Sequence, residues 1–600
     1  MATHRSRLGI AMASLALLAM ALGPTTAAAA SPSAALVGSP GSPPGDCPTI
    51  MPLTQIVAGQ TGTGWTVTSG HTPQPFVVHI LGVMPDGIAP GHDMVVIRIA
   101  DEPGSHIISD AGGIWAGMSG SPVYVAGELV GSVSYGFSTG PSMVGGLTPA
   151  EDMATILTYP GATTAARTFR LSPDLRRMVA HAAGVSLAAA SSFSRLPVPF
   201  VVSGLDPAAR KRLQVALARQ GIDAMVVPGA AAKAPRANDP GFATPVPGGN
   251  FAGLISYGDV TVGGVGTTTY VCAGRAIAFG HPLAFAGRTA FGANDADALA
   301  IVTDPTLTPF KMANIGDLFG VLDQDRLVGI RAHLATTPAL IPVTARVRSL
   351  ELGRSRTGET DVTMSDFVEG IAPQHLFSDI ISATDRQGAG TALLHWVIKG
   401  TRPNGDPWTL DRTDRVTSSG DIASAAAFAL DDDLYTIANN PLEPVTFDSV
   451  SINTRVSAKF SLGTLSSMLV SRNGGPFTLP ATLKVKPGDA LTVRVKVRQY
   501  GGVVSSSDVH LTVPADAVGS GQLVVVGGAD VPSSSCAFDP SSCPRRFPGL
   551  LRTLANAPRG DDIVATLGLF GPNGPLKGAT SRATQPVVVS GELDLDVLVR

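Results

Sequence analysis

A serine lies between two glycines at the start of a run of strand-forming residues. The stretch GIWAGMSGSPVYVAGELVGSVSYGF covers residues 113–137, and within it Gly117 and Gly120 flank Met118-Ser119. Glycines permit backbone conformations closed to residues with a Cβ, so the serine can project from a tight loop while successive N–H groups turn inward. Such N–H groups stabilise an oxygen that becomes negative during acyl transfer. The pattern predicts a nucleophilic serine at position 119; the alternative is a plain Gly/Ser loop between two strands.

The residues after this serine predict a rigid support for it. PVYV and LVGSVSYG alternate as strands do, and Ala126-Gly127 marks the turn of a hairpin between them. A loop braced by a hairpin is a sound place for a reactive side chain. Ser121, which precedes Pro122 at the start of the hairpin, is the other possible nucleophile, and we expect it to help set the turn instead.

A serine nucleophile needs a base, and His281 is the best candidate. It follows the apolar strand RAIAFG and precedes Pro282, where the end of a strand can fix an imidazole at the edge of a cleft. His106 competes because it is close to Ser119 in sequence, but members of a catalytic group usually meet across the fold. The alternative for His281 is a structural histidine in a turn.

These segments resemble a known family. GMSGSP followed by a hairpin resembles the nucleophile segment of trypsin-like serine peptidases, and GGIxxGMSGSP with G-x-L-x-G-x-V is more similar to the SpoIVB family of bacterial serine peptidases. The resemblance implies that Ser119 is the nucleophile and that the N–H groups of Gly117 and Ser119 are the oxyanion donors. It also implies that GGVGTTTYVCAGRAIAFGHPL, residues 263–283, is the histidine segment. In that family the histidine precedes the serine, so the order here is reversed, which two β-barrels with the site between them would allow.

Several carboxylates are candidates for the acid that orients the imidazole. The family has an aspartate a little upstream of the serine motif, and we favour Asp101, with Glu102 and Asp110 in the same segment. Asp323 and Asp325, downstream of the histidine, would instead match the trypsin-like arrangement, in which the acid shares the histidine's barrel.

The elements that must position these residues are mainly strands. The 600 residues include 68 glycines and 47 prolines, and 44% are apolar, a mixture typical of short buried strands separated by turns. We expect a mainly β fold with some helix: two β-barrel-like units of trypsin-like type in rearranged order, a mixed segment, and a C-terminal β-sandwich-like domain. Helices are expected over residues 208–220, which Asp206 and Pro207 introduce, and over residues 377–396.

The domain organisation follows from these patterns and from Pro/Gly-rich breaks between them. The predicted ranges are a signal peptide at 1–30, a linker at 31–46, a β domain with the serine motif at 47–155, a helical segment and linker at 156–248, a β domain with the histidine motif at 249–350, a mixed α/β segment at 351–440, and the C-terminal β-sandwich-like domain at 441–600.

The N-terminus and the cysteines predict an exported protein. Arg5 precedes the apolar run LGIAMASLALLAMALG, and small residues suited to cleavage follow near Ala30, which is typical of a secretory signal peptide; a retained membrane anchor is the alternative. Four cysteines fit an oxidising compartment. The expected disulfide is Cys536–Cys543, and a link from the mature N-terminus to a later strand is open for the remaining two, Cys47 and Cys272.

Composition and motifs exclude several function classes. A net charge of -3 gives no bulk basic excess for binding nucleic acid, and no metal or nucleotide motif suggests a cofactor. We expect a secreted or envelope-associated serine endopeptidase that acts on a protein or peptide. Three roles are open for its C-terminal domain: contact with the cell envelope, presentation of substrate, or cover for the edge of a sheet. The alternatives are an inactive exported scaffold that keeps the peptidase fold, and an adhesion protein that acts through residues 441–600.

Overall fold

The computed structural model describes residues 46–136, 141–158, 168–170, 192–219, 222, 224–235, 241–303, 308–531, 544–571, 574–575 and 579–600. The predicted signal peptide, the predicted linker up to residue 45, and the predicted disulfide Cys536–Cys543 lie outside these residues. Strands make up 51% of the structure and helices 16%, so the prediction of a mainly β fold with some helix is confirmed. In the part of the chain that the structure describes, no helix is long and apolar enough to cross a bilayer.

The serine motif lies in a closed antiparallel barrel of six strands. The order around this first barrel is β4 (Pro122–Val125), β1 (Thr61–Thr66), β2 (Gln74–Ala89), β3 (His92–Ala100), β6 (Val144–Pro149) and β5 (Glu128–Gly136), and the pairing of β4 with β5 closes it. The predicted turn at Ala126-Gly127 is confirmed: both residues have positive φ, 51° and 84°, as a two-residue hairpin turn of type I′ requires. Two short helices, α1 (Ile107–Ala111) and α2 (Ala150–Thr155), complete this unit.

The histidine motif lies in a second ring of six antiparallel strands. Its order is β12 (Val262–Cys272), β13 (Arg275–Ala278), β16 (Gly329–Leu334), β15 (Phe310–Arg326), β14 (Gly287–Val302) and β11 (Asn250–Gly258), and the pairing of β11 with β12 closes the ring. The two barrel-like units that we predicted from the sequence are therefore present. The side chains of Phe251, Phe279 and Phe319 stack edge to face inside this second barrel.

The segment between the two barrels contributes strands as well as a helix. The predicted helix after Asp206 is α4 (Pro207–Arg219), and the Asp206 carboxylate caps it by accepting the N–H of Ala209 at 2.7 Å. Strand β9 (Val198–Val202) pairs with β12, and β10 (Ala224–Pro228) pairs with β9. Strand β8 (Ser192–Arg195) pairs instead with β5 of the first barrel and with β7 (Thr168–Arg170).

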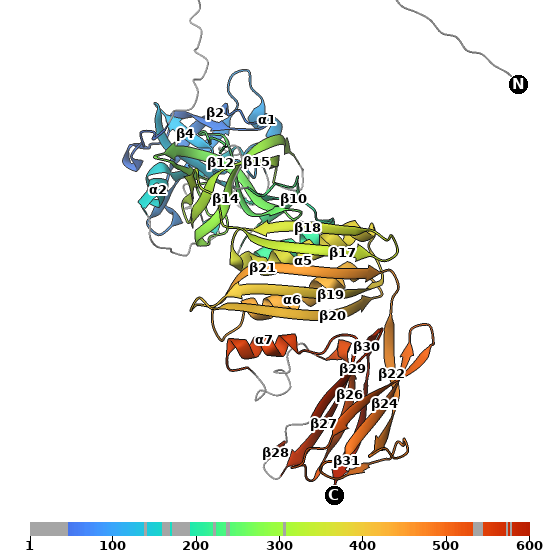
Figure 1. The fold of residues 1–600 in the computed structure, drawn as a ribbon. Helices are drawn as coiled ribbons and strands as arrows, with labels where there is room; N and C mark the ends of the chain where they lie inside the picture. Colours follow the sequence, from blue (N-terminus) through green and yellow to red (C-terminus); the bar gives the residue numbers. More distant parts are fainter. Residues whose placement is uncertain are drawn as a thin grey trace, which may run out of the picture. The chain divides into compact units, whose positions relative to one another are not determined.

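A further layer of strands extends the second barrel's sheet. It runs through β18 (Ser355–Val362), β17 (Ile341–Ser349), β21 (Thr446–Ser457), β19 (Gly390–Thr401) and β20 (Pro407–Ser418), and helices α5 (Val368–Thr384) and α6 (Ile422–Ala438) cover one face of it (Figure 1). Strand β21 falls within the range predicted for the C-terminal domain, but it pairs with β17 and β19. The helix predicted over 377–396 ends at Thr384, and its last seven residues belong to β19.

The last part of the chain forms two sheets that share one apolar core, as the sandwich prediction requires (Figure 1). One sheet has the order β25 (Val504–Thr512), β24 (Ala490–Gln499), β22 (Leu462–Arg472) and β30 (Val588–Ser590). The other has the order β23 (Leu483–Val485), β31 (Glu592–Val599), β26 (Ser520–Gly527), β27 (Asp562–Gly571) and β28 (Gly574–Pro575), with β29 (Ala579–Thr584) also paired to β27. Helix α7 (Phe547–Ala555) packs elsewhere, with Phe547 against Trp408 of β20. The exact domain boundaries stay predictions.

Candidate active site

The serine turn depends on two glycines with positive φ, Gly117 at 96° and Gly120 at 97°. Inside the turn, the N–H of Met118 donates to the carbonyl of Trp115 at 3.1 Å, and the N–H of Gly120 donates to Val133 of β5 at 2.8 Å. A Cβ on Gly120 would lie 1.9 Å from the carbonyl oxygen of the second barrel's Thr267. Glycine is required at this position both by the backbone conformation and by the close approach of the second barrel.

Strand β12 of the second barrel holds the serine turn in place. The backbone N–H of Thr267 donates to the carbonyl of Ser119 at 2.8 Å, and its hydroxyl donates to the carbonyl of Gly117 at 3.1 Å. The hydroxyl of Thr269 donates to the carbonyl of Gly120 at 2.8 Å. Both threonines are fully buried, so water does not compete for these hydrogen bonds.

The first barrel holds the histidine turn in the same way. Phe279 and Gly280, which follow β13, have positive φ of 67° and 66° and turn the chain just before His281. The hydroxyl of Thr148 in β6 donates to the carbonyl of Gly280 at 2.5 Å, and the hydroxyl of Ser134 in β5 donates to the carbonyl of Phe279 at 3.4 Å. Each barrel therefore fixes the turn that carries the other barrel's candidate residue.

The structure brings Ser119 and His281 together across 162 residues of sequence. Nε2 of His281 lies 2.8 Å from Oγ of Ser119, and Nδ1 lies 2.8 Å from the carbonyl oxygen of Pro282. A carbonyl oxygen can only accept, so Nδ1 carries the proton in the neutral imidazole. The lone pair of Nε2 then accepts the hydroxyl hydrogen of Ser119, which is the tautomer that a general base needs.

Burial keeps this imidazole neutral. His281 is 1% exposed, and burial lowers its pKa to about 3; the positive charge of Arg195 lowers it further, while the hydrogen bond to Pro282 opposes the shift. At neutral pH the side chain is therefore an unprotonated base beside a hydroxyl.

This depressed pKa predicts a specific loss of stability in acid. An unfolded histidine takes up a proton below its ordinary pKa of 6.5, whereas folded His281 does not do so until its pKa of about 3, so stability falls as the pH drops between these values. From pH 6.5 to 4.5 the wild type should lose about 2 to 3 kcal/mol that the variant His281→Leu does not lose. Urea unfolding followed by tryptophan fluorescence at both pH values measures the difference. Equal losses in the two proteins would contradict the buried neutral state.

The predicted oxyanion donors have free hydrogens in the described part of the structure. The N–H groups of Met118, Gly120 and Ser121 are all hydrogen-bonded within the turn or to β5. Among the described residues, the N–H groups of Gly117 and Ser119 donate no hydrogen bond. Buried N–H groups without a partner are rare because they are costly, so these two are free to act as the predicted oxyanion donors, a role that stays a prediction.

The structure does not bring the favoured acid, Asp101, to the imidazole. The Asp101 carboxylate accepts the backbone N–H groups of Ile108 at 2.7 Å and Ser109 at 3.2 Å, so it caps the start of α1. Partial burial alone raises the pKa of Asp101, but hydrogen bonds from Ser109 and Ile108 bring it below its ordinary value. The competing base, His106, lies exposed at the same helix start, and its described hydrogen bonds stay local to α1.

Of the two downstream acids, Asp325 lies behind the histidine. It is fully buried and accepts the backbone N–H groups of Leu283 and Ala284 at 2.8 Å and of Ala286 at 3.1 Å, which fixes the loop that follows His281. Burial raises the pKa of Asp325, and these three donors partly offset the shift. In the described structure no carboxylate touches the imidazole, so the group that orients it is the carbonyl of Pro282, whose loop Asp325 holds.

The remaining sequence candidates have structural surroundings. Asp323 forms a bidentate ion pair with Arg331, at 2.7 and 3.0 Å. Ser121 is fully buried, and its hydroxyl has no partner in the described structure, whereas its N–H bonds to Met118 inside the turn. Trp115 is completely buried in the first barrel's core.

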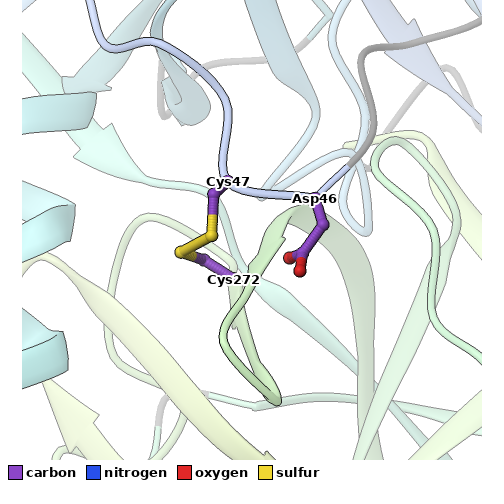
Figure 2. A group of neighbouring side chains, drawn as sticks. All are labelled: Asp46, Cys47 and Cys272. Carbon is purple, nitrogen blue, oxygen red and sulfur yellow. A yellow bond between two sulfur atoms is a disulfide. The ribbon is translucent and has the colours of Figure 1, made fainter.

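A disulfide links the start of the described chain to the second barrel. Cys47 is bonded to Cys272, the last residue of β12 (Figure 2). The backbone N–H of Cys47 donates to the carbonyl of Val271 at 2.7 Å. The bond closes a loop with a sequence separation of 225 residues, which stabilises the folded state by about 5 kcal/mol in the chain-entropy model. Asp46 lies beside it, but both sulfurs are used by the disulfide, so this trio offers no thiolate to a metal (Figure 2).

A second group of possible metal ligands, Asp259, His375 and Asp379, lies outside the site. Arg356 already pairs with both of its carboxylates, at 2.8 Å to Asp259 and 2.5 Å to Asp379. The guanidinium already balances the charge of both carboxylates, so we describe this group as an ion-pair cluster that joins β18 to α5.

The serine turn lies in a part of the chain that is similar to a known family. Residues 48–153 match the family model of the SpoIVB peptidase S55. The matched range holds the first barrel with Ser119 and its hairpin and ends before His281, so the resemblance that the motifs indicated is confirmed for this range. No curated protein and no solved structure matches the chain. The match suggests a serine peptidase of the SpoIVB kind, and with it a protein substrate.

Proposed function

We propose that this chain is a secreted serine endopeptidase of the SpoIVB kind, which hydrolyses peptide bonds through an acyl-enzyme on Ser119. The observation that carries the proposal is the 2.8 Å contact between the Ser119 hydroxyl and Nε2 of His281, with Nδ1 held by a carbonyl so that Nε2 accepts. The unpaired N–H groups of Gly117 and Ser119 supply the third requirement, a site for negative charge. Export is supported by the charged and apolar N-terminus and by the Cys47–Cys272 disulfide.

The mechanism follows from these contacts. Oγ of Ser119 attacks the peptide carbonyl carbon while its proton moves to Nε2 of His281, and the carbonyl oxygen, now negative, accepts the N–H groups of Gly117 and Ser119. The C–N bond then breaks, and the departing amine takes the proton from Nε2. Water attacks the acyl-enzyme by the same route in reverse and releases the carboxylic acid.

This proposal differs from a Ser-His-Asp triad in the group behind the base. The imidazolium that forms during the reaction is stabilised by the carbonyl of Pro282, which is a weaker partner than a carboxylate. Asp325 acts as a positioning residue, because its three hydrogen bonds hold the loop that presents this carbonyl. The same weak partner favours one rival, an inactive scaffold that keeps the fold.

Labelling by a fluorophosphonate separates the two functions. The probe should attach to Ser119, as located by mass spectrometry of the digested protein, and the variant Ser119→Ala should not label. Ser121→Ala is the matched control, since this serine lies two residues away and does not contact His281; it should still label. Attachment at Ser121, or none after prolonged incubation, would favour the scaffold.

A further inference from the structure

A lysine that the proposed mechanism does not use lies in the interior beside the serine turn. Lys311, the second residue of β15, is fully buried. Lysine is almost never fully buried unless it is paired with an acid, because burial disfavours its charged form. In the part of the chain that the structure describes, Lys311 forms no ion pair, and its Nζ donates to a neutral group, Oδ1 of Asn250, at 3.0 Å.

The near end of this side chain contacts the serine turn. The backbone N–H of Lys311 donates to the carbonyl of Ala116 at 2.8 Å, and the N–H of Ala116 donates to the carbonyl of Pro309 at 2.7 Å. A Cβ on Gly117 would lie 2.8 Å from the Cβ of Lys311. The lysine side chain therefore starts directly against Gly117, one of the two candidate oxyanion donors.

The far end of the side chain lies beside the strand that holds the serine turn. Asn250 opens β11 and lies opposite Thr267 of β12, the threonine that donates two hydrogen bonds to the turn. The Asn250 amide nitrogen donates to the carbonyls of Gly70 at 3.0 Å and Ala296 at 2.5 Å, so its oxygen is left to accept from the lysine. Both ends of Lys311 are fixed beside groups that position the serine.

The charge of this ammonium is not cancelled by the described neighbours. The serine turn and strands β9, β11 and β12 carry no aspartate, glutamate, histidine, lysine or arginine. Burial raises the pKa of the tyrosines on β11 and β12 above its ordinary value, so both stay neutral. On β14, Arg288 is exposed, and Asp295 and Asp297 pair with His71, at 2.8 and 3.7 Å, instead of with Lys311.

A buried ammonium without a counter-charge costs free energy, and an aliphatic side chain would fill the same space without that cost. A negative charge does form nearby during acyl transfer, on the oxygen that the candidate donors accept. We propose that the Lys311 ammonium, held by Asn250 beside the serine turn, stabilises the oxyanion bound to the N–H of Gly117, so that the reaction is favoured while Lys311 is protonated. This inference rests on the proposed function and adds a controlling charge to the same site.

The charge of Lys311 changes close to neutral pH. Burial lowers the pKa of Lys311 to about 7, so the side chain is an ammonium below this pH and a neutral amine above it. His281, with a pKa of about 3, is neutral on both sides of pH 7 and gives no step there. The rate at which a fluorophosphonate labels Ser119 should therefore fall about tenfold as the pH rises through 7, because the new negative oxygen loses a nearby positive charge.

Labelling rates of the full chain and three variants, measured from about pH 5.5 to 9, test this role. Lys311→Met removes the charge from a side chain of similar length, so it should label about tenfold more slowly than the wild type at about pH 6 and show no step near pH 7. Asn250→Asp puts a carboxylate beside Nζ and should move the step upward by about one pH unit or more, because an opposite charge favours the ammonium. Lys399→Met, at an exposed position in β19, is the matched control and should keep the wild-type rate and step.

A purely structural role for Lys311 predicts a different result, an equal loss of rate at every pH in Lys311→Met. That result, a wild type without a step near pH 7, or an unmoved step in Asn250→Asp would overturn the inference and leave the proposed function standing. The wild-type step and its shift in Asn250→Asp do not depend on whether Lys311→Met folds, which circular dichroism checks. A wild type that does not label at any pH defeats the proposed function, and this inference with it.

Discussion

Replacing His281 by glutamine is expected to lower kcat/KM for an ester or peptide substrate on the order of 10⁴-fold. Nε2 lies 2.8 Å from the Ser119 hydroxyl, and no other described side chain is within hydrogen-bond distance of that oxygen to take its proton. A glutamine can still form a hydrogen bond, but it cannot accept a proton at neutral pH. Initial rates of hydrolysis, corrected for the concentration of folded protein, give the effect.

The control for this experiment is the histidine that sequence proximity favoured. His106 lies exposed at the start of α1, and His106→Gln should leave the rate unchanged. Circular dichroism of both variants shows whether the fold is kept. If His281→Gln retains activity within tenfold of the wild type, or if His106→Gln loses as much, then the Ser119–His281 pair does not carry the reaction.

Replacing Gly120 by alanine is expected to have the second largest effect. Its Cβ would lie 1.9 Å from the Thr267 carbonyl and 2.6 Å from the Phe279 backbone nitrogen, both main-chain atoms that cannot move aside. The serine turn must therefore shift away from the second barrel. A displacement of about 1 Å between reacting groups can cost on the order of 10²-fold in rate, so we expect at least that loss in kcat/KM.

Gly127→Ala is the matched control for the effect of the backbone conformation. Gly127 lies in the turn of the hairpin that follows the serine turn, and its φ of 84° is close to the 97° of Gly120, but nothing lies within 4 Å of its Cβ position. Both variants should lose about 1 to 2 kcal/mol because alanine is strained at positive φ. Only Gly120→Ala should also lose activity and further stability. Similar rates in the two variants would show that the contact between barrels does not position the serine.

The sequence predicted those features of the site that depend on residues close together in the chain. Positive φ at Gly117 and Gly120 follows from glycines around a tight turn, and the hairpin turn at Ala126-Gly127 follows from the strands on either side. His281 was selected as the base from its position at the end of an apolar strand and from the family resemblance, because local pattern alone cannot show which distant segments meet.

The group that orients the imidazole, the carbonyl of Pro282, could not be predicted from the sequence. Every residue has a carbonyl, so nothing distinguishes that of Pro282 until the turn at Phe279 is formed. Asp101 was favoured for its place upstream of the motif, but a carboxylate near a helix start is equally suited to capping, and capping is what it does. Asp325 carried one usable signal, its position in the histidine's own barrel.

Two elements of the fold also differ from the sequence prediction: one in where a helix ends, and one in which strands pair. The helix predicted over 377–396 stops at Thr384 because Asp385 adopts a left-handed conformation, and Gly390 then opens β19. The β domain predicted from residue 441 begins with the strand Thr446–Ser457, but a β-rich pattern does not show which strands pair, and the partners of this one are β17 and β19. Partner choice depends on contacts distant in sequence.

Each barrel holds the turn that carries the other barrel's candidate residue. This arrangement determines when, during synthesis, the chain could become reactive. Ser119 is synthesised 162 residues ahead of His281, and the threonines that grip its turn come from the later barrel as well. On the proposed mechanism, a nascent or truncated chain that ends before β12 would carry the Ser119 hydroxyl without its base and without the two threonines that hold its turn. The chain would thus become able to cleave peptide bonds only after both barrels have been synthesised and packed together, which would protect the unfinished polypeptide from premature proteolysis.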